Sequence, residues 1–289
     1  MDGTLLSSTT APKALTSTLK PVPQTSSLFL TALIPEIRII IYEYVFECKD
    51  LHIFIYEQQL VSMLCKNPTA IGIDGHENCI GMPMSRSPGM GWNQDAIQER
   101  LSPSNKRHVS ALLAVCCAIY LESVDILYER YTLHFSNLFS ISVFPRAMIP
   151  HHLDMLHHVR LSLALFNRGT MIHAYFNNSF SRSWPGWDEG SLSGDTPWDC
   201  AWNAIGELTS LHSLLVTIEV LREDHGREDP HWHRSMSSDF EASLLQPMKQ
   251  VKCDNFLLRV NWPSTRSPLT LDEYPFQIQR FTSTETQDQ

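Results

Sequence analysis

The sequence predicts an α/β fold, with α+β as the alternative, in which helices pack on an irregular and mostly parallel sheet. Three segments alternate apolar and polar residues with the period of two that is typical of strands. They are 159–165, 214–220 and 256–262. Two helical patterns lie between them, one with Trp198 and Trp202 on its apolar face and one with Phe240 and Leu244. Strands that alternate with helices imply right-handed crossovers and parallel pairing.

Two further helices are predicted before these strands. The first begins at Pro35, a residue favoured at the first helical position, and Glu36 follows it near the positive end of the helix dipole. Its apolar residues form one continuous face and are Ile37, Ile40, Ile41, Tyr44 and Val45. The second helix spans about 106–129, where apolar residues repeat at spacings of three and four. We expect the helices at about 35–47 and 106–129 to pack together.

Shorter elements are expected around the second helix. Residues 132–135 alternate like a strand, Asn137 is placed to cap a brief helix, and Pro145 is expected to end that helix. Earlier in the chain, residues 49–105 are poorly patterned, and only 51–56 has the pattern of a strand. We therefore expect a loop-rich insertion at about 49–105.

Composition and pattern divide the chain into four parts. Residues 1–27 hold eleven Ser and Thr, three Pro and no aromatic side chain, so they are expected to form a disordered tail. Residues 28–165 are expected to form a first region, and 166–270 a β/α part that packs with it as one globular unit. A C-terminal tail is expected at 271–289.

Charge and hydropathy exclude several classes of protein. The 289 residues include 31 acidic and 22 basic side chains, and no run of Lys and Arg is concentrated enough to indicate a nucleic-acid partner. The longest apolar stretch, Ala111 to Leu121, is shorter than the roughly 20 residues that cross a bilayer, so no membrane partner is expected. Seven cysteines without paired spacing, and no signal-peptide pattern, favour an intracellular protein of the cytoplasm or nucleus.

Common catalytic and cofactor motifs are absent from the sequence, including a Gly-rich phosphate loop, a GxSxG elbow, HExxH and a CxxC pair. We therefore expect no catalytic residues and no cofactor, and we favour a non-enzymatic protein. Five thiol and imidazole side chains in or beside the loop-rich insertion are of the types that bind tetrahedral zinc. They are Cys48, His52, Cys65, His76 and Cys79. Their spacing differs from that of common zinc fingers, so a metal site stays an open alternative.

Two long connections are predicted to leave the sheet at its carboxyl edge, where parallel α/β proteins commonly bind their partners. The connection after the first strand contains Trp184 and Trp187, and the one after the second contains Arg222 and Trp232. Aromatic and Arg side chains are enriched among residues that dominate binding energy. We predict a partner-binding surface here, with coverage of the sheet edge as the alternative role of the Trp residues.

Two blocks of the sequence resemble known families. The letters LIPEIR at 33–38, followed by IY at 41–42 and VF at 45–46, resemble the L-P-x-E-I-R-x-x-I-Y-x-x-V-F opening of fungal F-box-like proteins. The letters LLAVC, IYLE and ILY within 112–135 resemble a block of the fungal DUF7730 family. Together the two matches span about residues 28–165.

This resemblance implies a helical F-box-like unit followed by degenerate leucine-rich-like repeats. It also implies that Pro35, Glu36, Ile37 and Ile41 bind a Skp1-like subunit, as in a ubiquitin-ligase substrate adaptor. The two blocks lie about 60 residues apart, whereas the helices of an F-box are only a few residues apart. The expected function is a non-enzymatic adaptor or scaffold for protein interactions in a fungal cell. The alternative is an accessory protein or enzyme of fungal specialised metabolism with a site in the His- and Trp-rich loops.

Overall fold

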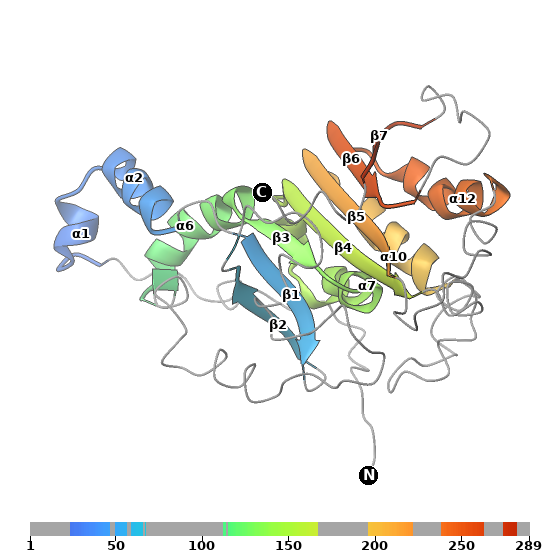
Figure 1. Cartoon of the computed structure of the whole chain (residues 1–289). Coiled ribbons are helices and arrows are strands. Elements are labelled where there is room, and N and C mark those ends of the chain that lie inside the picture. Colours follow the sequence, from blue (N-terminus) through green and yellow to red (C-terminus); the bar gives the residue numbers. More distant parts are fainter. Residues whose placement is uncertain are drawn as a thin grey trace, which may run out of the picture.

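The computed structural model (Figure 1) describes residues 24–46, 50–56, 59–65, 67, 112–113, 115–166, 196–221, 238–262 and 274–281. Most of the expected tail at 1–27 lies outside these residues, as does most of the loop-rich insertion. The described residues contain helices packed on a largely parallel sheet, which confirms the predicted α/β class.

The described strands form one seven-stranded sheet in the order β2-β1-β3-β4-β5-β6-β7. They are β1 (Asp50–Tyr56), β2 (Gln59–Leu64), β3 (Thr132–Phe135), β4 (His158–Phe166), β5 (Ser213–Leu221), β6 (Asn255–Val260) and β7 (Gln277–Arg280). β1 and β2 pair antiparallel, and the other neighbouring strands pair parallel. The predicted strands at 159–165, 214–220 and 256–262 correspond to β4, β5 and β6, and their parallel pairing is confirmed.

Four helices in the described part of the chain cover one face of this sheet. Successive parallel strands follow one another in the same direction across the sheet, so right-handed crossovers place the helices between them on the same side. They are α7 (Leu138–Ala147), α10 (Pro197–Gly206), α12 (Ser238–Leu245) and the 3-10 helix η3 (Gln246–Gln250). α10 packs between α7 and η3. In the part of the chain that the structure describes, no helix has the length and hydropathy to cross a membrane.

The main hydrophobic core lies between the sheet and these helices. Leu133, Val159, Leu214 and Phe256 are register neighbours on β3 to β6, and all four are buried on the helix side. Trp202 of α10 is fully buried there and stacks on Phe256 with 6.1 Å between ring centroids. Aromatic side chains therefore supply much of the contact between layers.

A second hydrophobic cluster holds the N-terminal helices. They are α1 (Leu28–Thr31) and α2 (Pro35–Phe46), which together we call the arm, and α6 (Cys117–Arg130). The cluster consists of Tyr42, Phe46, Ile119, Leu127 and Tyr131. Figure 1 shows the arm at one end of the molecule, with α6 between it and the sheet. The predicted packing of the first two long helices on one another is confirmed by the contact of α2 with α6.

Several predicted boundaries are wrong. The second helix was expected at about 106–129, but the extended backbone of Cys116, with φ −163° and ψ 163°, interrupts it, so α6 begins at Cys117. Residues 106–111 lie outside the described residues, and 112–113 are helical. The expected loop-rich insertion contains β2, whose hydrogen bonds to β1 make it part of the sheet. β7 lies in the expected C-terminal tail, where Phe276 and Phe281 are buried. Pro145 lies inside the last turn of α7 and does not end it at that residue.

Candidate partner-binding site

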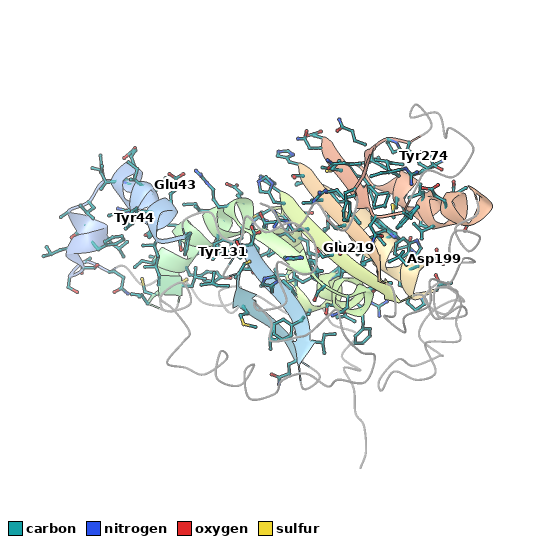
Figure 2. The ribbon with its side chains drawn as sticks, viewed as in Figure 1. Glu43, Tyr44, Tyr131, Asp199, Glu219 and Tyr274 are labelled. Atoms are coloured by element: carbon teal, nitrogen blue, oxygen red, sulfur yellow. The ribbon has the colours of Figure 1, made fainter. Side chains whose placement is uncertain are left out.

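Helix α2 carries an apolar stripe on the surface of the protein. The stripe consists of Ile37, Ile40, Ile41 and Tyr44, whose spacing of three and four places them on one face of the helix. Ile37 is 41% exposed, Ile40 58% and Tyr44 81%, while Ile41 is half-buried. Figure 2 shows Tyr44 on the arm. An exposed set of anchors at positions i, i+3, i+4 and i+7 is typical of a helix that docks into a groove of another protein.

The opposite face of α2 attaches the helix to the rest of the protein. The buried residues of α2 follow one another at a spacing of four and are Arg38, Tyr42 and Phe46. Tyr42 and Phe46 contribute to the second hydrophobic cluster with α6, and the ring of Phe29 in α1 lies 5.9 Å from that of Tyr42. α2 is therefore apolar on two sides, of which only one is used inside the described structure.

A polar clamp joins the arm to α6, and it consists of Arg38, Tyr42 and Glu122. The Nε and Nη2 atoms of Arg38 donate to the two carboxylate oxygens of Glu122 at 2.8 and 2.7 Å. The hydroxyl of Tyr42 donates to the same carboxylate at 3.0 Å. The Nη1 atom of Arg38 donates to the carbonyl oxygens of Leu33 at 2.6 Å and Leu30 at 3.3 Å. A second ion pair, between Arg130 and Glu43, joins the same two helices at the surface.

The clamp shifts the protonation equilibria of its own members. The hydrogen bond from Arg38 lowers the pKa of Glu122 below its ordinary value, and the hydrogen bond from Tyr42 acts in the same direction against the effect of burial. Burial, followed by the nearby carboxylate of Glu122, raises the pKa of Tyr42. At neutral pH the clamp therefore contains an ionised Glu122 and a protonated Tyr42.

We expect acid to loosen the arm through Glu122. The pKa of Glu122 in the folded protein lies below the ordinary value of 4.5, so ionisation of Glu122 stabilises the docked arm at pH values above 4.5. This stabilisation is lost as the pH falls through the folded-state pKa. Backbone amide NMR signals of α1 and α2 should therefore broaden or shift in acid. The variant Glu122→Gln should remove this pH dependence, and an unchanged acid transition in the variant would assign it to another group.

Of the eight binding residues predicted from the sequence, four lie in the described part of the structure and four do not. Pro35, Glu36 and Ile37 are exposed at the start of α2, and Ile41 is half-buried one turn later, so all four lie within the first two turns of the helix. The other four lie outside the described residues and are Trp184, Trp187, Arg222 and Trp232. The alternative site in the His- and Trp-rich loops falls in the same undescribed segments. Trp198, however, is buried in the main core, where its Nε1 donates to the carbonyl oxygen of Leu244 at 3.0 Å.

The predicted zinc ligands are only partly described. His52 lies on β1 and is fully buried, and Cys65 follows β2. Cys48, His76 and Cys79 lie outside the described residues. Within the described ranges, no three His, Cys, Asp or Glu side chains are grouped so that they could hold a metal ion.

A buried polar cluster that sequence reasoning missed lies on the sheet face opposite the helices. His52, His134 and Arg160 are register neighbours on β1, β3 and β4. The rings of His52 and His134 lie 4.6 Å apart, and Nε2 of His134 lies 2.9 Å from the hydroxyl oxygen of Ser162. Arg160 pairs with Asp50 at 2.9 Å. Alternation along each strand shows that these residues share a face, but only the register shows that they are neighbours.

The pairing of Ser162 with His134 has two of the groups that a nucleophilic site requires. Such a site also needs room for a substrate beside the nucleophile and the oxyanion donors. Ser162 is 2% exposed and His134 1%, so neither side chain presents a surface to a substrate. The cluster is a buried polar layer in which the hydrogen bond of His134 with Ser162 joins β3 to β4 and the ion pair of Arg160 with Asp50 joins β4 to β1.

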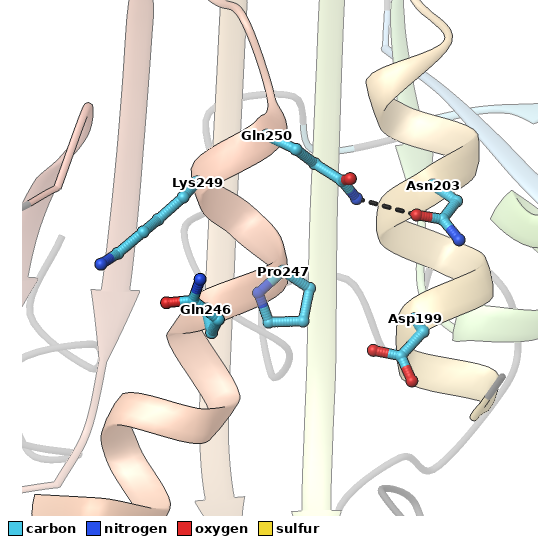
Figure 3. Close-up of a pocket in the computed structure, with 6 residues that line it drawn as sticks. All are labelled: Asp199, Asn203, Gln246, Pro247, Lys249 and Gln250. Atoms are coloured by element: carbon cyan, nitrogen blue, oxygen red, sulfur yellow. Dashed lines mark hydrogen bonds between the residues drawn. The ribbon is translucent and has the colours of Figure 1, made fainter.

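A shallow, open depression of about 560 Å³ lies between α10 and η3 (Figure 3). Three of its polar residues, Asp199, Asn203 and Gln250, make hydrogen bonds within or between the helices. Asp199 accepts hydrogen bonds from the backbone and hydroxyl of Thr196 at the start of α10, and Gln250 donates to Asn203 at 3.0 Å. These contacts cap a helix and join two helices, so the depression supports no specific chemistry.

Comparison with known proteins identifies the family. A family model described as a domain of unknown function, DUF7730, matches residues 22–281. The chain belongs to the DUF7730 family. In this DUF7730 protein the match includes the arm, α6 and the whole described sheet, so both blocks of resemblance lie in one family domain. No curated protein and no solved structure matches the DUF7730 chain.

Proposed function

We propose that this DUF7730 protein is a non-enzymatic adaptor whose helix α2 docks into an apolar groove of a Skp1-like subunit. The observation that carries the proposal is the exposed apolar stripe of Ile37, Ile40, Ile41 and Tyr44. Exposing such side chains to water is unfavourable, and a contiguous apolar surface of this kind indicates an interaction site. The stripe lies in the segment that resembles the opening of F-box-like proteins.

The arrangement of the helices supports an F-box-like reading of the arm. α1, α2 and α6 share one hydrophobic cluster that is separate from the main core. The sequence gap between α2 and α6 is occupied in part by β1 and β2, which extend the sheet beside β3. The long separation of the two sequence blocks is therefore compatible with a compact three-helix unit into which sheet strands are inserted.

The sheet supports the second half of the adaptor proposal. Its parallel strands follow chain order from β3 to β7, and helices α7, α10 and α12 lie on one side. Leucine-rich-like repeats also stack strand beside strand in chain order and use the resulting extended surface for recognition. We propose that the sheet domain recognises the protein that the arm brings to the ligase subunit.

Binding of a purified fungal Skp1 protein tests the proposal. We expect the full chain to form a complex that is visible by gel filtration and calorimetry. Because hot-spot residues contribute about 2 kcal/mol or more, the variant Ile37→Glu should weaken binding by at least about 30-fold. Ile40→Glu should have a similar effect.

The matched control is Ile39→Glu on the same helix. Ile39 is 42% exposed, almost the same as Ile37, but it points away from the stripe because two helical residues are separated by about 200°. Ile39→Glu should bind within about threefold of the unmodified chain. A chain that forms no complex, or equal losses for the variants at 37 and 39, would contradict the proposal.

A further inference from the structure

We infer that Arg38 is a positioning residue: its guanidinium holds α1, α2 and α6 as one rigid unit and so sets partner affinity without touching the partner. The affinity part of this inference rests on the proposed function, whereas the rigidity part concerns the protein alone. Arg38 is 8% exposed and its side chain is directed to Glu122 on α6, so the guanidinium is buried between the two helices, whereas Ile37 and Ile40 of the stripe are exposed. A docking partner that covers the stripe therefore does not contact it.

The guanidinium is suited to this role because it is planar and donates in several fixed directions. Two donors form a bidentate pair with the carboxylate of Glu122 on α6. The third nitrogen donates to the carbonyl oxygens of Leu30, in α1, and Leu33, in the turn before α2. One side chain of α2 thus joins three separate segments, which a Lys ammonium could not reproduce with the same geometry.

Helix α1 depends on this anchor more than the other helices do. It has four residues, Leu28–Thr31, and a single helical turn is unstable in isolation because nucleation fixes several residues for few hydrogen bonds. None of its residues is buried. It is attached by the hydrogen bond from Arg38 to Leu30, by the ring contact of Phe29 with Tyr42 and by the packing of the half-buried Phe29 and Leu30 on the second hydrophobic cluster.

The ion pair of Arg130 with Glu43 cannot replace the clamp. It also joins α2 to α6, but its side chains are 49% and 39% exposed, and exposed pairs contribute little because water screens them and the long side chains lose entropy. In the clamp the Glu122 side chain is 35% exposed, but the Arg38 side chain is only 9% exposed and forms four hydrogen bonds. A rigid arm presents the stripe in a single arrangement, which reduces the entropy lost when a partner binds.

Hydrogen exchange of the full chain without any partner tests the rigidity. The reporters are the amides of Thr31 and Ala32, which donate to Ser27 and Leu28 at 2.9 Å. We expect Arg38→Met to speed their exchange at least tenfold, Arg38→Lys to give an intermediate rate, and the matched control Arg130→Met to change it less than twofold. Unchanged exchange in Arg38→Met would overturn the inference.

The milder variant Glu122→Gln keeps the size of the side chain and serves if Arg38→Met does not fold. It should also speed exchange at Thr31 and Ala32, and unchanged exchange in this variant would overturn the inference in the same way.

Affinity for the purified Skp1 protein tests the consequence. Arg38→Met should bind about tenfold more weakly than the unmodified chain, although the stripe of Ile37 and Ile40 is intact. Equal affinity would overturn the positioning role. If the unmodified chain does not bind the Skp1 protein, the proposed function fails, and the exchange experiment still decides whether Arg38 holds the arm.

Discussion

Replacing Trp202 with Ala is expected to destabilise the protein by about 3–5 kcal/mol, because truncating a fully buried Trp removes apolar contacts and leaves a cavity. Trp202 is 0% exposed and lies between Trp198, at 5.5 Å, and Phe256, at 6.1 Å. Trp202 contacts both the sheet and a neighbouring side chain of its own helix, so a shift of the helix or of the sheet alone would not fill the cavity left by Ala. Urea unfolding monitored by circular dichroism measures the loss as a lower midpoint.

A comparison of two Trp→Phe variants separates packing from hydrogen bonding. The Nε1 atom of Trp202 has no hydrogen-bond partner among the described residues, so Trp202→Phe should lose packing area only. Trp198→Phe removes the donor to the Leu244 carbonyl oxygen and should cost about 1–3 kcal/mol more, because that buried acceptor loses a partner. Equal losses for the two variants would show that the Trp198 hydrogen bond adds no net stability.

The second large effect is expected at Glu241 on α12. Its side chain is 1% exposed and accepts hydrogen bonds from Nη2 of Arg280 at 2.7 Å and from Nε1 of Trp262 at 3.0 Å. Glu241→Leu would leave both donors without this acceptor. Removing one partner of a buried pair costs about 3–5 kcal/mol, and we expect about 2–3 kcal/mol here because Arg280 is partly exposed.

The control for this prediction is Glu241→Gln. Its carbonyl oxygen can still accept from Trp262 and Arg280, so we expect a loss of about 1 kcal/mol, the difference between a charged and a neutral hydrogen bond. Thermal unfolding of the two variants beside the unmodified chain gives the comparison. If the Glu241→Leu variant has the same free energy of unfolding as the Glu241→Gln variant, the prediction is wrong, and apolar packing of Leu compensates for the lost ion pair.

The sheet was predictable because its strands are short, regular and separated by clear helical patterns. In β4 and β5 every second residue is apolar, and those such as Leu161 and Val216 are buried on the helix side, so alternation alone located these strands. Pro197 at the start of α10, after the capping residue Thr196, marks that helix equally clearly. β2 was missed because its residues are mostly exposed or half-buried and show little alternation of apolar with polar side chains. β7 does alternate, but it has only four residues, which is too short for a clear strand pattern.

The start of α6 was not predictable from periodicity. Leu112 and Leu113 continue the apolar spacing of the helix, and both contribute to the second hydrophobic cluster. The extended backbone of Cys116 separates them from α6 all the same. Because residues on both sides of the break pack in the same hydrophobic cluster, the apolar spacing continues across the break. The spacing therefore does not indicate where the helix is interrupted.

The sequence by itself determined that residues of about 35–47 form an apolar helix and that several parallel strands follow, because helical and strand periodicities are local properties of the chain. Only the tertiary structure decided which face of α2 is used internally. Arg38 and Tyr42 are directed inward because Glu122, distant in sequence, is placed by α6 to accept their hydrogen bonds. Ile37 and Ile40 are left outside for the same reason. An apolar pattern shows which residues avoid water, but which of them are covered depends on segments brought together by the fold.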